Sequence, residues 1–85
     1  MNHKEYIQQV VADELSKQIE KSGYVLCTDF KNMVVGRYGF SVAEIAGALD
    51  RAYKQLGLCR MRASNTVKRY YGLNVEGYPI IFLRK

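Results

Sequence analysis

The sequence predicts a single small α+β domain in which helices pack on a short β-sheet. The chain has 85 residues, 48% of them hydrophobic, and its glycines separate amphipathic stretches from short β-favouring runs. A chain of this length buries only about 60–65% of its unfolded surface, so we expect one lean core and no second domain within residues 1–85. The expected element order is helix, strand, helix, helix, helix and a terminal β-hairpin.

The N-terminal half is expected to form a long helix, a strand and a second, short helix. Apolar residues recur every three or four positions over 4–22, and Gly23 follows where a left-handed C-terminal cap is expected. The run 24–28 is rich in β-favouring residues and predicts a strand. A short helix is expected over 30–35, ended by the glycine-containing segment 36–39.

The clearest local signal predicts a third helix over 42–56. Ser41 and Glu44 have the spacing of a capping box, in which each side chain hydrogen-bonds a free backbone amide at the start of the helix. Phe40 and Ile45 match the hydrophobic staple that accompanies such a box.

The remainder is expected to contain a basic connector over 58–62, a helix over 65–71 and a β-hairpin over 73–83. Ser64 is the predicted N-cap of this helix, and Gly72 is its predicted end. The hairpin is predicted from two β-favouring runs separated by a Glu-Gly pair.

Charge is distributed unevenly along the chain. The sequence holds 13 Lys and Arg and 8 Asp and Glu, which gives a net charge of +5. Residues 1–42 contain five basic and five acidic residues, whereas residues 43–85 contain eight basic and three acidic ones. No acidic residue occurs over 51–75. A basic stretch without acids indicates contact with phosphate backbones.

The segment 41–71 resembles the helix-turn-helix of winged-helix DNA-binding domains. Residues 41–49, SVAEIAGAL, look like the first helix of that motif, and residues 64–71, SNTVKRYY, look like its recognition helix. The resemblance implies that the second helix enters the major groove and that the terminal hairpin is the wing. The connection between the two helices is longer than the three or four residues of a compact motif.

These observations predict double-stranded DNA binding by a small transcriptional or replication regulator. Val67 and Tyr70 of the predicted recognition helix are expected to face inward, Tyr53 to lie in the core and Tyr71 to be exposed. The predicted interface comprises Arg51, Lys54, Arg60, Arg62, Ser64, Asn65, Thr66, Lys68, Arg69, Tyr71, Arg84 and Lys85.

A second hypothesis is single-stranded RNA or DNA binding. The tetrapeptide Gly36-Arg37-Tyr38-Gly39 is similar to the G-x-x-G loop of a KH domain. In that family the loop clamps the backbone of four nucleotides. The resemblance implies that the glycines allow close approach to phosphate and that Arg37 supplies positive charge.

A third hypothesis is a small protein-interaction module, such as a phage- or plasmid-type inhibitor, that binds an acidic protein surface. Basic charge alone does not separate this hypothesis from DNA binding. The neutral helix over 4–22 either closes the core or pairs with a second copy in a homodimer.

No catalytic residue, metal site or cofactor is predicted. His3 is the only histidine, and Cys27 and Cys59 lack the spacing of zinc ligands. No run approaches the ~18 apolar residues of a membrane span, and the polar start lacks the apolar run of a secretory signal. We therefore expect a cytoplasmic protein with two free thiols and no membrane partner.

Overall fold

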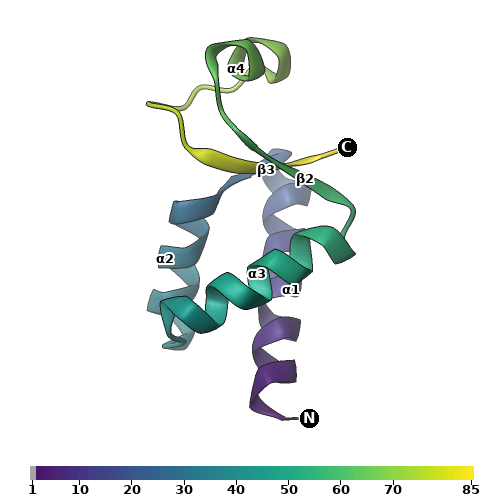
Figure 1. Ribbon diagram of the computed structural model, residues 1–85, viewed down its shortest axis with the longest axis vertical. Helices are drawn as coiled ribbons and strands as arrows, with labels where there is room; N and C mark the ends of the chain where they lie inside the picture. The colour runs from purple at the N-terminus through teal and green to yellow at the C-terminus, as the bar shows by residue number, and fades with distance from the viewer. Residues whose placement is uncertain (1) are drawn as a thin grey trace.

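The computed structural model describes residues 2–85, in which three helices cover one face of a three-stranded sheet and a fourth covers the other (Figure 1). The molecule measures 42 × 22 × 19 Å, with α1 running along the long axis and α4 at the end remote from the N-terminus. The α+β class is confirmed. The elements are α1 (His3–Ser22), β1 (Tyr24–Leu26), α2 (Cys27–Tyr38), α3 (Val42–Gln55), β2 (Leu58–Arg62), α4 (Asn65–Tyr71) and β3 (Ile80–Arg84).

The C-terminal strand β3 is the central strand of the sheet. The strand order is β1-β3-β2, and both pairings are antiparallel. Phe82 stands opposite Val25 on one neighbour and Arg60 on the other. Because side chains alternate along a strand, Phe82 faces the helices, whereas Ile81 and Leu83 face the opposite side.

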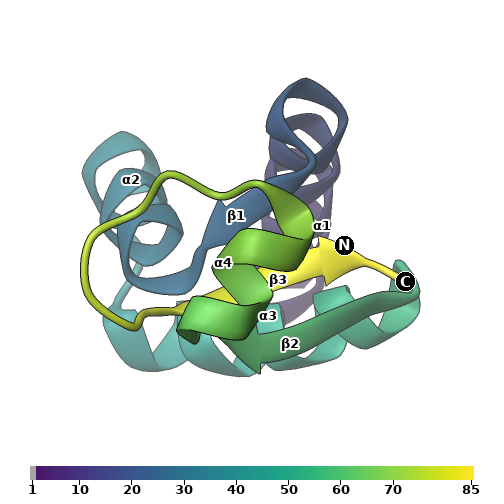
Figure 2. The ribbon, with the colours of Figure 1, turned by 90° about the horizontal axis from the view of Figure 1, so that it is seen from above.

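Two apolar clusters lie on the two faces of this sheet. The larger cluster joins α1, α2 and α3 to the sheet through Ile7, Val11, Leu15, Ile19, Phe30, Val34, Ile45, Leu49 and Phe82. The smaller cluster, under α4 and the loop that follows it, contains Ala63, Ile81 and Leu83, with Val67, Leu73 and Val75 packed against them. Figure 2 shows α4 lying across the sheet, on the side away from α3. The domain therefore has three layers although it has only 85 residues.

The predicted terminal hairpin is wrong. Residues 73–75 form no strand, and β3 pairs instead with β2, which the sequence predicts to be a connector. The strand is hidden in the sequence because its two arginines alternate with Cys59 and Met61, which pack on the outer face of the sheet. The two arginines project to the other face, the one that the helices cover. They are tolerated because β2 is an edge strand and their charged ends reach water.

The predicted helix starts and ends are confirmed where a cap defines them. Gly23 follows α1 with φ +82°, in the left-handed region that favours glycine. Both bonds of the capping box are present, with Glu44 N 3.1 Å from Ser41 Oγ and Ser41 N 3.0 Å from Glu44 Oε1. The Ser64 hydroxyl accepts a hydrogen bond from Val67 N at 3.2 Å.

The helix α2 extends beyond the predicted 30–35 at both ends. It begins at Cys27, so the predicted strand over 24–28 ends at Leu26, and a buried carboxylate on α1 holds its last turn. Glu14 is only 5% exposed, and its two oxygens accept hydrogen bonds from Arg37 Nη1 at 2.9 Å and from the Tyr38 hydroxyl at 3.1 Å. These donors compensate the cost of burying the charge. Burial, together with the neighbouring Glu14 carboxylate, raises the pKa of Tyr38.

The capping box of α3 carries a pH-dependent prediction. Hydrogen bonds from the Ser41 backbone and side chain, followed by His3 at 2.9 Å, hold the pKa of the Glu44 carboxyl below its ordinary value of 4.5. A group with a lowered folded-state pKa stabilises the protein above its unfolded-state pKa, and this contribution disappears as pH falls through the folded-state value. We expect Glu44→Gln to lower the urea midpoint at neutral pH and to have progressively less effect below pH 4.5.

The measurement is urea unfolding of both proteins at several pH values. Glu76→Gln, in the exposed loop before β3, is the matched control. A constant difference between wild type and Glu44→Gln across the acid range would contradict the prediction.

Candidate nucleic-acid interface

Basic residues of β2, α2 and α4 lie along one flank of β2. Arg60 and Arg62 are two positions apart on the strand, so they project to the same side. Both are exposed, whereas Leu58 on that side is buried. Arg60 lines a hollow of about 140 Å³ with Lys31 of α2 and Tyr53 of α3.

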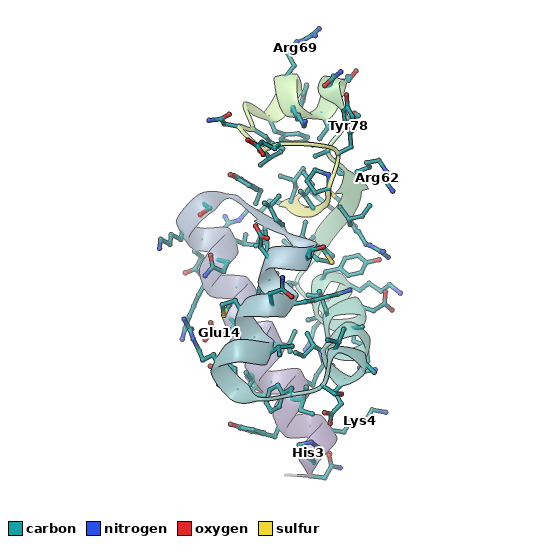
Figure 3. The ribbon with its side chains drawn as sticks, turned by 90° about the vertical axis from the view of Figure 1, so that its left-hand side faces the viewer. His3, Lys4, Glu14, Arg62, Arg69 and Tyr78 are labelled. Atoms are coloured by element: carbon teal, nitrogen blue, oxygen red, sulfur yellow. The ribbon has the colours of Figure 1, made fainter. Side chains whose placement is uncertain are left out.

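An exposed tyrosine stands at the upper end of this flank. Arg62 Nη1 donates a hydrogen bond to the Tyr78 carbonyl at 2.9 Å, and Lys68 Nζ donates one to the Gly77 carbonyl. The same Lys68 nitrogen lies 4.7 Å from the centre of the Tyr78 ring, within the range of a cation–π contact. Tyr78 is 55% exposed, and Figure 3 shows Arg62 and Tyr78 on the same side of the molecule.

We call this surface the basic face and define it by Lys31, Arg60, Arg62, Lys68 and Tyr78. Asp50 is the acidic residue that lines the hollow beneath Arg60. The Asp50 carboxylate lies 3.3 Å from Lys54 Nζ, one helical turn along α3, so Asp50 offsets the charge of Lys54.

The helix predicted to be the recognition helix, α4, does not follow α3 in a compact motif. The strand β2 lies between them, and α4 covers the other face of the sheet (Figure 2). Instead, α2 and α3 are joined by the three residues 39–41, the turn length of a compact helix-turn-helix. The sequence contains that signal, since Gly39 precedes the Ser41 capping box, but α2 is predicted to end too early to show it.

The side chains of α4 are arranged partly as predicted. Val67 packs inward as expected, and Asn65 and Thr66 are exposed. The predicted burial of Tyr70 is wrong, because the residue is 80% exposed and stacks edge-on against Tyr71 at 4.8 Å. The seven-residue helix packs on the sheet along one side only, and Tyr70 lies outside that side with Tyr71 as its aromatic neighbour.

Exposure of Tyr71 is confirmed at 41%. Tyr53 is half-buried, with its ring 5.1 Å from that of Phe82, which agrees with its predicted place at the core. Arg69 is exposed, and Figure 3 shows it projecting from α4 away from the rest of the molecule.

Three other predicted interface residues lie away from the basic face. Arg51 turns toward α1, where its Nε donates to Gln8 Oε1 at 2.8 Å. Arg84 stands opposite Leu58, at the other end of the β2–β3 pair from Arg62, and lines a separate hollow with Lys85. The basic stretch in the sequence therefore divides among separate surfaces in the fold.

The predicted G-x-x-G loop is not a loop. Gly36, Arg37 and Tyr38 form the last turn of α2, and only Gly39, with φ +72°, leaves the helix. Arg37 is committed to the buried Glu14 carboxylate and is therefore not free for a phosphate. The segment is helical because Glu14 holds both Arg37 and Tyr38, a contact between residues more than 20 positions apart.

Both cysteines are free, with Cys27 in the helix-side core and Cys59 against the outer face of the sheet. Over residues 2–85 no group of three His, Cys, Asp or Glu side chains is arranged to hold a metal ion. Within the same range, none of the helices combines the length and apolar character needed to cross a membrane.

No protein-family model, curated protein or solved structure matches this chain.

A pair of glycine substitutions tests the assignment of residues 36–39. Gly36 has ordinary helical geometry and open space at its Cβ position, so Gly36→Ala should raise the free energy of unfolding by about 0.5–1 kcal/mol. Gly39 has open space too, but its positive φ makes Gly39→Ala destabilising by about 1 kcal/mol or more. Chemical denaturation measures both effects. If Gly36→Ala lowers the free energy of unfolding as much as Gly39→Ala does, residues 36–38 are not helical and the predicted G-x-x-G loop is favoured.

Proposed function

We propose that this protein binds double-stranded DNA through the basic face. The observation that carries the proposal is the exposed Tyr78 between Arg62 and Lys68, next to the unpaired flank of β2. Arginine, lysine and tyrosine side chains are typical contacts to phosphate oxygens. Residues 63–79, which connect β2 to β3 and include α4, take the place of the wing.

The turn between α2 and α3 supports a duplex target. In a helix-turn-helix the second helix enters the major groove, and here that helix is α3 rather than the predicted α4. Ala46 of α3 borders the hollow lined by Lys31 and Arg60. A small side chain at this point lets the helix approach DNA closely, while Lys31 and Arg60 of the same hollow contact phosphates and Asp50 is paired with Lys54.

Salt dependence provides the first test. Each neutralised phosphate contributes about −0.9 to the slope of log K against log salt concentration, so four basic residues predict a slope of roughly −3 to −4. We expect the affinity for a labelled duplex, measured by fluorescence anisotropy, to fall roughly 100-fold between about 50 and 200 mM salt.

Charge removal localises the contact. The double variant Arg60→Gln, Arg62→Gln should lower the magnitude of the slope by about 2, because two phosphate contacts are lost. The matched control is Lys17→Gln, Lys21→Gln on α1, which should leave the slope unchanged. Absence of binding at low salt, or equal effects in the two variants, would contradict the proposal.

Substitution of the exposed tyrosines Tyr78 and Tyr70 is expected to affect duplex affinity differently. Tyr78→Ala should weaken duplex binding about tenfold, since it removes an aromatic contact and a hydroxyl donor. Tyr70→Ala, on the outward side of α4, should change it less than about twofold. Circular dichroism checks that both variants fold. A larger effect of Tyr70→Ala would place the interface on α4 instead.

The same basic face favours a second candidate function, binding to an acidic protein surface. Tyrosine and arginine are over-represented among the residues that dominate protein interfaces, and Arg62 and Tyr78 lie together in an exposed position. Capture of one acidic protein, with no duplex binding even at low salt, favours this function over DNA binding.

A further inference from the structure

A second polar surface lies in the cleft between α1 and α3. Two hollows, of about 470 Å³ and 280 Å³, share Lys4 of α1 and Arg51 of α3 in their linings. The larger is lined almost wholly by polar side chains, including Gln9 and Gln55, and by one small residue, Ala12. Its volume is in the range of sites for small molecules.

A hydrogen bond across the cleft orients the Arg51 side chain. Its Nε donates to Gln8 Oε1 at 2.8 Å, and a Cβ atom at Gly47 would lie 3.6 Å from its Nη1, so the guanidinium lies along the surface of α3. The bond to Nε leaves the two terminal nitrogens as donors, in the planar fork that matches a carboxylate or phosphate.

The cations of the cleft have no carboxylate partner. The four ion pairs found over residues 2–85 include neither Lys4 nor Arg51. The Gln8 amide must turn its oxygen to Arg51, which leaves its Nε2 buried without a hydrogen-bond partner. A buried donor without an acceptor costs about 1–3 kcal/mol, so this cluster is incompletely satisfied as it stands.

Two carboxylates line the cleft itself, Glu5 in the larger hollow and Glu44 in the smaller one, and they limit the charge of a ligand. Glu44 accepts from the Ser41 amide and lies beside His3, and Glu5 accepts from Asn2 Nδ2 at 3.3 Å. Carboxylates in this position would repel a long polyanion lying along the cleft, such as a nucleic-acid backbone. They permit a ligand with a single anionic group at the part of the cleft that Lys4 and Arg51 line.

We propose that the cleft between α1 and α3 binds a small organic anion through its carboxylate or phosphate group. Arg51 and Lys4 bind the anionic group, Gln8 acts as the positioning residue for Arg51, and the surrounding glutamines hydrogen-bond a polar body. This site is separate from the basic face and does not depend on DNA binding.

The test is an NMR titration of the ¹⁵N-labelled chain of residues 1–85. Sodium acetate and sodium phosphate are added in separate series to about 50 mM, with sodium chloride used to hold the ionic strength constant. We expect saturable shifts of the Arg51 Nε–H and the Gln8 side-chain amide. Saturation by acetate, by phosphate or by both assigns the chemical class of the anionic group.

Three variants complete the experiment. Arg51→Gln should abolish saturation, and Lys4→Gln should weaken it about fivefold or more. Lys54→Gln, which removes an exposed charge paired with Asp50 on the same helix, should change it less than about twofold. The amide spectrum of each variant reports whether the fold is retained.

Three results would overturn the proposal. The first is an equal, non-saturating response to chloride, and the second is saturation that persists in folded Arg51→Gln. The third is a shift of Arg51 caused by duplex DNA but by neither small anion, which would return this residue to the DNA interface.

Discussion

The structure depends on the pairing of β3 with two strands that are distant from it in the sequence. β3 pairs with both β1 and β2, and its alternating side chains enter both apolar clusters. Phe82 closes the helix-side core, while Ile81 and Leu83 form the surface that α4 covers. Because burial of these side chains is the main source of stability in so small a domain, the sheet and both layers are expected to form together.

The charge of the fold follows from where its carboxylates are placed. Glu14 is buried and links α1 to α2 through its contacts with Arg37 and Tyr38. Asp50 pairs with Lys54 on α3 and offsets its charge. Arg62 of β2 and Lys68 of α4 have backbone carbonyls as their hydrogen-bond partners instead, which orient them without removing their charge. Part of the positive charge of the chain is thereby left uncompensated on the flank of β2, while Arg51, Arg84 and Lys85 lie on other surfaces.

Helix α3 contributes to both proposed surfaces. Ala46 and Asp50 face the hollow beside β2, whereas Gly47 and Arg51 face the cleft beside α1. These pairs occupy neighbouring positions, so one helix separates a basic face suited to a polyanion from a cleft suited to a single anionic group. Asp50, which lines the hollow beside β2, is paired with Lys54, whereas Glu5 and Glu44 line the cleft and, over residues 2–85, form no ion pair with Lys4 or Arg51.

The sequence by itself determined the features that depend on neighbours along the chain. The extent of α1, the capping box of α3 and the Ser64 cap of α4 were all predictable, because periodicity and capping act over three or four residues. Tertiary structure alone decided the pairing of β2 with β3, the extension of α2 and the division of the basic residues. Each requires a partner far away in the sequence, as Glu14 is for Arg37, and local patterns contain no record of which distant residues will meet.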